Sequence, residues 1–195
     1  NDHRMYSRFL KPLFDFIIAL LLLIVLLPAL LAITLLLLIT GVNKPFFLQK
    51  RSGYRCQTFV IIKFRTMTDE KDRSGNLLPD KDRLTFIGKL IRKTSIDEIP
   101  QLVNIIKGDM SLIGPRPLLP RYLPYYSKEE NSRHKVKPGI TGLAQVNGRN
   151  TLGWDQRLAL DIEYVNNMSL NQDIIIFLKS IKIVLYSKGG YIDPQ

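Results

Sequence analysis

The adjacent acids Asp97 and Glu98 are the two residues of this chain whose types and surroundings best suit chemistry at phosphorus. A basic stretch that includes Arg92 precedes them, and a predicted helix from Pro100 to Lys107 follows them. Nearby cations and the positive end of a helix both favour a bound phosphate group. At such a place one carboxylate can attack phosphorus while a hard cation such as Mg²⁺ neutralises a diphosphate.

Two interpretations of this acidic pair are open. In the first, the side chains of adjacent residues point in different directions, so Asp97 is the nucleophile and Mg²⁺ ligand while Glu98 supports it. In the second, Ser95 and Glu98 form a capping box at the start of a helix, and Asp97 only complements the helix dipole. For the pair taken without other motifs, the second interpretation is the stronger one.

Four basic residues are candidates to bind substrate phosphates. Arg116 lies between two prolines, which restrict the backbone and hold the guanidinium in one direction. Arg149 follows an Asn-Gly turn signal that can direct it into a cleft. Lys63 ends a predicted hairpin, and Arg92 belongs to the basic stretch before the acids. Each of them, taken singly, is more often a solvated surface charge.

Other reactive side chains are few. The chain has two histidines, His3 and His134, and one cysteine, Cys56. A serine, histidine and acid triad, an internal disulfide and a zinc site of cysteines and histidines are therefore poorly supported. Neither a P-loop nor a GxGxxG motif occurs. The single cysteine fits a reducing cytoplasm for the polar part of the chain.

The charge balance points to anionic partners. Lysine and arginine number 28 against 17 acidic residues, which gives a formal charge of +11 over 195 residues. Nucleic acid, an acidic membrane surface and phosphorylated substrates would all suit this charge. Because the apolar residues gather near the N-terminus and the charges in the remainder, the pattern favours a membrane protein with one catalytic domain over a nucleic-acid binder.

An uncharged apolar block runs from Phe16 to Ile39. As one helix it would extend roughly 36 Å, enough to cross a bilayer, and it is too long for a cleaved signal peptide. Pro28 lies in its middle and lacks the amide that a continuous helix uses there. Basic residues flank both ends, near Arg8 and near Lys44, so the positive-inside rule puts both ends in the cytoplasm. A re-entrant helix broken at Pro28 satisfies both observations; the alternative is a tilted spanning helix with a tolerated proline.

Downstream of this block the patterns predict a mixed α/β domain that is mostly helical. A β-hairpin delivers Lys63 and Arg65 at its far end. The predicted elements are strands Phe46 to Gln49 and Thr58 to Phe64, a loop from Asp69 to Asp82, and helices Arg83 to Lys93, Pro100 to Lys107 and Asn171 to Ser187. The last helix has a broad apolar face and two lysines, which is typical of an amphipathic helix at a membrane interface, although a core helix is the alternative.

Four ordered motifs stand out when the chain is taken as a whole. They are KFRTM (Lys63 to Met67), SIDEIPQL (Ser95 to Leu102), KGDMSLIGPRP (Lys107 to Pro117) and KPGITGLAQVNGR (Lys137 to Arg149). With these motifs the chain resembles the monotopic phosphoglycosyl transferases, the bacterial sugar transferase family, in the small form that is little more than the catalytic domain. The resemblance extends from the apolar segment to about Tyr164 and is highly specific.

This resemblance implies a re-entrant membrane helix broken at a proline, a cytoplasmic active site and a covalent aspartyl-phosphosugar intermediate, formed with release of a nucleoside monophosphate. Asp97 matches the nucleophile of the family, and Glu98 matches its acidic neighbour. The phosphate-binding positions are matched by Lys63, Arg116 and Arg149. Leu27 departs from the pattern, because family members often have a small polar residue before the proline.

By the same resemblance, the donor is a UDP-sugar, with an N-acetylated sugar expected, and the acceptor is undecaprenyl phosphate. UMP is released in ping-pong kinetics, Mg²⁺ is the cofactor, and the product is the first lipid-linked intermediate of a bacterial glycan. The expected location is the bacterial inner membrane, with the catalytic domain on the cytoplasmic face. Membrane lipids are expected partners, nucleic acid is not, and a homodimer is allowed.

These expectations divide the chain into three parts. Residues 1–4, which precede Met5, are expected to be remnants of an expression tag, residues 5–42 the re-entrant helix and residues 43–195 the catalytic domain with its interfacial helices. The rival hypothesis is a non-catalytic, membrane-anchored basic module that binds anionic lipid or nucleic acid. It explains the charge and the anchor equally well, but not an acidic pair within four ordered motifs.

Overall fold

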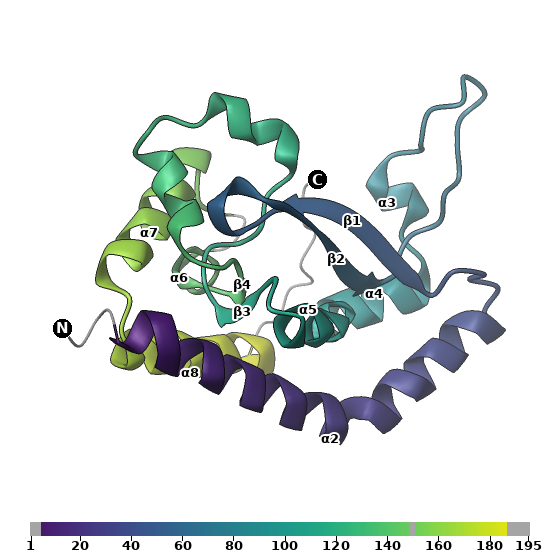
Figure 1. Cartoon of the computed structure of the whole chain (residues 1–195). Helices are drawn as coiled ribbons and strands as arrows, with labels where there is room; N and C mark the ends of the chain where they lie inside the picture. Colours follow the sequence, from purple (N-terminus) through teal and green to yellow (C-terminus); the bar gives the residue numbers. More distant parts are fainter. Residues whose placement is uncertain (1–4, 149–150, 187–195) are drawn as a thin grey trace.

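The structure is a computed structural model that describes residues 5–148 and 151–186. The expectation that residues 1–4 are tag remnants lies outside the described residues, and so does Arg149. One long N-terminal helix runs along one edge of the molecule, and the hairpin and the shorter helices form a globular unit beside it (Figure 1). The predicted class, mostly helical with a small amount of β-structure, is confirmed.

The N-terminal helix begins with a π-helical turn, η1 (Tyr6–Leu10), and continues as α2 (Lys11–Ile39). Together they form an apolar helix that is long enough to cross a membrane. We predicted a break in the helix at Pro28. The helical structure continues through this residue. Instead α2 is bent near its middle (Figure 1). A proline inside a helix removes one hydrogen bond and crowds the preceding turn, which bends the helix.

Both arms of the bent helix pack against the globular unit. On the first arm, Ala19 is fully buried in a cluster with Leu102 and Met110. On the second arm, Leu37 is buried against Phe64 and Ile91. Both arms of α2 are therefore joined to the globular unit by buried apolar contacts, and the membrane topology of the helix stays a prediction.

Buried polar side chains hold the start of α2 to the rest of the protein. We call this group the N-terminal clamp; it consists of Tyr6, Lys11, Asp15, Ser111, Tyr164 and Asp173. Lys11 Nζ lies 2.5 Å from Asp173 Oδ2, and the Tyr6 hydroxyl donates to the same oxygen at 2.6 Å. The Tyr164 hydroxyl lies 2.8 Å from Asp173 Oδ1, and Ser111 Oγ donates to Asp15 at 2.6 Å. Paired in this way, the buried charges avoid the cost of isolated ones.

The predicted hairpin is confirmed. β1 (Phe46–Ser52) pairs antiparallel with β2 (Thr58–Phe64), and the tip contains the 3₁₀ turn η2 (Tyr54–Cys56). The first strand is three residues longer than predicted, because Ser52 still pairs with Thr58. Lys63 lies opposite Phe47, at the end of the hairpin that faces the acidic pair.

The helix predicted over Arg83 to Lys93 is divided in two. A short turn, α3 (Asp80–Arg83), closes the predicted loop, and α4 (Phe86–Lys93) starts three residues later. Leu84 is extended between them and forms an isolated bridge with Met67. Thr85 then caps α4, since its hydroxyl accepts a hydrogen bond from the Gly88 amide at 2.8 Å.

The helix predicted over Pro100 to Lys107 begins earlier than expected. A 3₁₀ helix, η3 (Ile96–Gln101), leads into α5 (Leu102–Ile106), so the two acids lie in the first turn of η3 and not before it. Ser95 has a left-handed backbone (φ 57°), and its side chain makes no capping hydrogen bond. The capping-box interpretation is therefore wrong.

The second half of the chain completes the globular unit. Two short strands pair in parallel, and the remaining elements are helical: β3 (Ser111–Ile113), η4 (Pro120–Tyr125), η5 (Glu130–Lys135), β4 (Gly139–Thr141), α6 (Leu143–Asn147), α7 (Trp154–Asn167) and α8 (Leu170–Tyr186). The sequence patterns did not predict the strand pair or α7.

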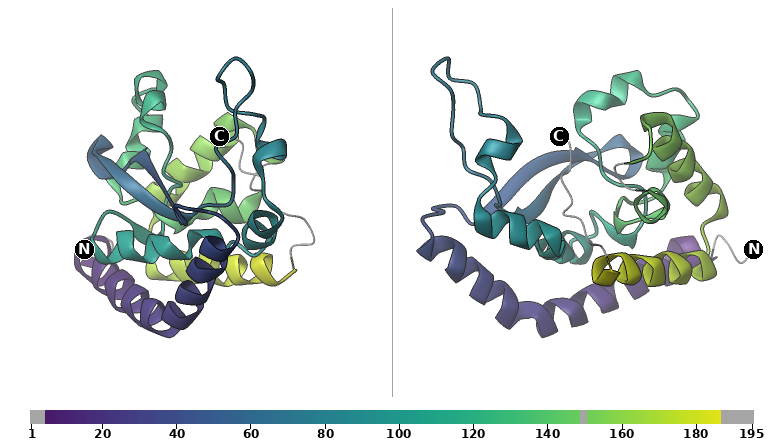
Figure 2. Two further views of the ribbon diagram at one scale, coloured as in Figure 1. Left: turned by 90° about the vertical axis from the view of Figure 1, so that its right-hand side faces the viewer. Right: turned by 180° about the vertical axis from the view of Figure 1, so that it is seen from behind.

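The C-terminal helix α8 lies beside the first arm of α2 (Figures 1 and 2). It matches the predicted helix within one residue at each end. Ile176 is fully buried, whereas seven large apolar side chains between residues 170 and 184 are exposed: Leu170, Ile174, Ile175, Phe177, Leu178, Ile181 and Val184. One face of α8 thus belongs to the core and another is open and apolar, and contact of the open face with a membrane stays a prediction.

Candidate active site

The acidic pair lies where η3 meets β2, α4 and the loop after β3. Glu98 Oε1 accepts hydrogen bonds from Lys63 Nζ at 2.8 Å and from an Arg116 nitrogen at 3.1 Å. Two cations that are far apart in the sequence therefore share one carboxylate oxygen. Burial works to raise the pKa of Glu98, but Lys63 and Arg116 outweigh it and lower the pKa to about 2. Glu98 is consequently ionised at neutral pH.

Asp97 has a different environment from its neighbour. It is only 9% exposed, yet its carboxylate accepts no hydrogen bond from the residues that the structure describes. Burial and the negative charge of Glu98 raise its pKa to about 6, and Lys63, Arg92 and Arg116 offset part of this effect. The oxygens of Asp97 are thus available to a ligand, while Glu98 is engaged with cations. This division agrees with the expectation that the two side chains point in different directions.

A small cationic pocket opens beside Asp97, with a volume of about 60 Å³. Lys63 and Arg92, two of the predicted phosphate-binding residues, line it, and Arg92 Nε donates to Thr66 Oγ1 at 2.8 Å. The structure adds three arginines to this pocket, namely Arg51, Arg65 and Arg83. Sequence analysis assigned none of these three to the site. Strand alternation could have indicated Arg51, because on β1 it shares a face with Phe47, the partner of Lys63.

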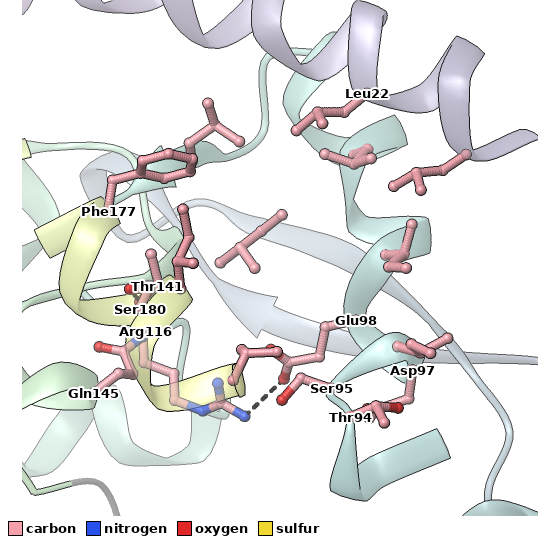
Figure 3. A pocket seen from close by; sticks show the side chains of 18 residues that line it. Leu22, Thr94, Ser95, Asp97, Glu98, Arg116, Thr141, Gln145, Phe177 and Ser180 are labelled. Carbon is pink, nitrogen blue, oxygen red and sulfur yellow. Dashed lines mark hydrogen bonds and ion pairs between the residues drawn. The ribbon is translucent and has the colours of Figure 1, made fainter. Parts of the chain in front are cut away.

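A larger, mainly apolar groove opens on the other side of the acidic pair, with a volume of about 390 Å³. Leu22 of α2 and Phe177 of α8 lie toward its apolar part, and Glu98 and Arg116 lie at its polar end (Figure 3). Other lining residues are Leu26, Ile99, Ile140, Thr141, Gln145, Ser180 and Ile181. Asp97 lines both the groove and the cationic pocket. An apolar chain with an anionic head would fit this arrangement.

The structure therefore brings together five of the predicted site residues: Lys63, Arg92, Asp97, Glu98 and Arg116. Pro28 does not line either cavity and acts on the shape of α2. Arg149 lies outside the described residues, so its predicted contact with phosphate stays a prediction.

The donor set suits a magnesium ion that is shared with a substrate. Among residues 5–148 and 151–186 there is no group of three His, Cys, Asp or Glu side chains that could hold a metal alone. Mg²⁺ is commonly held by one or two carboxylates together with substrate phosphates and water. Asp97 lies beside a phosphate-sized cationic pocket, and no donor from residues 5–148 or 151–186 occupies its carboxylate oxygens, so it fits this mode of binding.

Comparison with known proteins identifies the family. A family model described as "Bacterial sugar transferase" matches residues 6–187. The chain is 56% identical over 144 residues to the uncharacterized sugar transferase EpsL of Bacillus subtilis, which covers 74% of this chain and 71% of that protein. It is 38% identical over 198 residues to the exopolysaccharide production protein ExoY of Sinorhizobium fredii, covering 93% of this chain and 88% of that one. It is 36% identical over 191 residues to the UDP-glucose:undecaprenyl-phosphate glucose-1-phosphate transferase of Caulobacter vibrioides, covering 93% and 72%. The chain therefore belongs to the bacterial sugar transferase family, the phosphoglycosyl transferases that its four motifs resemble.

Proposed function

We propose that this protein transfers a sugar 1-phosphate from a UDP-sugar to undecaprenyl phosphate, with Asp97 as the nucleophile. The position of Asp97 carries the proposal, since this buried carboxylate lies between a cationic pocket and an apolar groove. The name of the Caulobacter relative, which acts on UDP-glucose and undecaprenyl phosphate, supports the substrate classes. The expectation of an N-acetylated sugar rests on the family resemblance alone.

In the first step an oxygen of Asp97 attacks the phosphorus that carries the sugar. The bond from that phosphorus to the bridging oxygen breaks, and UMP leaves with the bond electrons. In the second step a phosphate oxygen of the lipid attacks the same phosphorus, the bond to Asp97 breaks, and the carboxylate is regenerated. Each displacement places the attacking and leaving oxygens in line. The lipid phosphate must therefore approach from the side that UMP has left.

The neighbouring residues suit this chemistry. Lys63, Arg92 and Arg116 place positive charge where phosphate oxygens would bind, and such preorganised charge stabilises a transition state. Glu98 holds Lys63 and Arg116 in place before a substrate arrives. Mg²⁺ bound at Asp97 would neutralise the diphosphate of the donor. Arg149 would add a further phosphate contact.

The apolar groove suits the hydrocarbon chain of the acceptor. Its walls come from α2, the candidate membrane helix, and from α8, whose apolar face is open. A lipid phosphate in this groove could reach Asp97 while most of its chain remained in the bilayer. This arrangement supports an enzyme at the cytoplasmic face of the bacterial inner membrane, with α2 entering and leaving the bilayer on the same side.

We expect cysteines at the two ends of α2 to be labelled from the same side of the membrane. Arg8→Cys and Asn43→Cys are suitable, because both positions are exposed, and each is placed in a Cys56→Ser background to remove the native thiol. Intact spheroplasts should protect both cysteines from an impermeant maleimide, and permeabilised ones should label both. Labelling of one cysteine only in intact spheroplasts would show that α2 spans the bilayer.

The donor half-reaction is expected to depend on pH through Asp97. Only the ionised carboxylate is nucleophilic, and burial raises the pKa of Asp97 to about 6. UMP release should therefore be full above this pKa and should fall about tenfold per pH unit below it. A bound cation favours the carboxylate, so more Mg²⁺ should lower the apparent pKa. Initial rates over roughly pH 5 to 8, at two Mg²⁺ concentrations, test both points; a flat profile would contradict the assignment.

The rival hypothesis is that the protein is a non-catalytic basic module. One assay distinguishes this module from the transferase. Purified protein is incubated with Mg²⁺, undecaprenyl phosphate and a panel of UDP-sugars, and UMP release is followed. Release that requires Mg²⁺, the lipid and one donor would support the transferase and identify the sugar. Folded protein that releases no UMP from any donor, yet binds anionic vesicles, would favour the basic module.

A further inference from the structure

The loop that carries Arg116 is anchored at three consecutive backbone carbonyls. An Arg133 nitrogen donates to the Arg116 carbonyl at 2.7 Å. Arg51 donates to the Pro117 carbonyl at 3.4 Å, and both the amide and the hydroxyl of Ser52 donate to the Leu118 carbonyl at 2.9 Å. The backbone from Arg116 to Leu118 is thus held by groups from β1 and η5.

Arg133 is buried at 2% exposed, and it forms an ion pair with Asp161 of α7, which is 3% exposed. Two Arg133 nitrogens donate to Asp161 Oδ2, at 2.6 and 3.1 Å. The guanidinium also lies 5.9 Å from the centre of the Tyr126 ring. Because Asp161 neutralises it, Arg133 adds little net positive charge to the site.

We propose that the Arg133–Asp161 pair is a positioning device for Arg116. Arg133 does not line the groove or the cationic pocket. Among the described residues it meets the site at the Arg116 carbonyl, and through this contact it sets the position of the Arg116 guanidinium relative to Glu98. A displacement of about 1 Å in a phosphate-binding group can cost up to 100-fold in rate. This inference rests on the proposed function, in which Arg116 binds a substrate phosphate.

A purely structural role is the alternative, because the pair also joins η5 to α7. Loss of one partner would leave a buried, uncompensated charge and unfold part of the protein, whereas apolar replacement of both partners is often tolerated. The double variant Arg133→Met with Asp161→Leu therefore releases the Arg116 carbonyl without leaving a buried charge. Arg133→Lys is a second variant. Lysine keeps the positive charge beside Asp161 but lacks the planar guanidinium that binds the Asp161 carboxylate and the Arg116 carbonyl at the same time.

The test is a double-mutant cycle with Arg116→Ala, in the full chain in detergent. The readout is exchange of labelled UMP into UDP-sugar without lipid, which isolates the donor half-reaction. The double variant should lower exchange about tenfold or more when Arg116 is present. It should lower exchange by less than about twofold in the Arg116→Ala background, because the group that it positions is absent.

Equal losses in both backgrounds, or no loss when Arg116 is present, would overturn the positioning role. Exchange by the Arg116→Ala variant could be too slow to detect. In that case the same cycle is measured as UMP affinity, which is obtained from the rise in the thermal unfolding midpoint when UMP is added. If the double variant does not fold, Arg133→Lys takes its place in the cycle with the same expectations. Exchange that is absent in the unsubstituted protein, across the donor panel, would overturn the proposed function and this inference with it.

Discussion

Asp97→Asn is expected to abolish transfer, with a fall in UMP release of at least about 10³-fold. Asparagine has nearly the shape of aspartate, but its amide is not a nucleophile and is a poor ligand for Mg²⁺. Since the Asp97 carboxylate accepts no hydrogen bond from the described residues, the fold should tolerate the change. Loss of the charge also relieves repulsion with Glu98, whose proximity raises the pKa of Asp97.

The measurement is release of UMP from the identified donor, with and without lipid acceptor. Asp155→Asn is the matched control, because Asp155 is an exposed acid on α7 and lies outside both cavities. A basic module without catalysis would bind anionic vesicles as well as before, or better, after loss of the Asp97 charge. Asp97→Asn that retains more than about a tenth of the rate would exclude a covalent intermediate at this residue.

Asp173→Ala is expected to have the largest effect on stability. It removes the carboxylate that pairs with Lys11 and leaves that lysine buried, with Asp15 at 3.7 Å as the nearest acid. The Tyr6 hydroxyl loses its acceptor as well. Breaking a buried ion pair on one side costs about 3–5 kcal/mol. For a chain of this length the thermal midpoint should fall by roughly 6–20 °C.

Thermal unfolding in detergent, followed by circular dichroism, measures this effect. The exposed control is Asp155→Ala, which should shift the midpoint by less than about 2 °C. A second variant, Lys11→Met with Asp15→Asn and Asp173→Leu, should recover much of the loss, because the three charges that are buried together are then removed together. A midpoint for Asp173→Ala that matches the control would mean that the clamp does not hold α2 to α8.

Features that depend on neighbouring residues were predictable from the chain alone. The uncharged block of α2, the β-prone runs of the hairpin and the apolar face of α8 each follow from the types and spacing of residues a few positions apart. The predicted starts of two helices were wrong, because the backbone there departs from a regular helix. η3 begins four residues before Pro100, because Ser95 takes a left-handed conformation, and α4 begins late because Leu84 pairs with Met67.

The site shows the same division. Asp97, Glu98, Lys63 and Arg116 could be nominated from residue types and ordered motifs, since charged residues beside turns and helix ends are legible in one dimension. The contacts that these residues make with one another could not be predicted from the sequence. Glu98 becomes a partner of two cations, and Asp97 stays without a hydrogen bond among the described residues, only when β2, η3 and the loop after β3 meet.

The sequence by itself determined that an acidic pair, a basic surround and a membrane-length apolar helix belong to one chain. Tertiary structure alone decided the groove, in which Leu22 and Phe177 face one cavity, and the pairings of Arg133 with Asp161 and of Lys11 with Asp173. The physical reason is that helix and strand periods are set by residues a few positions apart. Cavities and buried ion pairs arise from contacts between residues that are distant in the chain, and packing alone selects which of many distant partners meet.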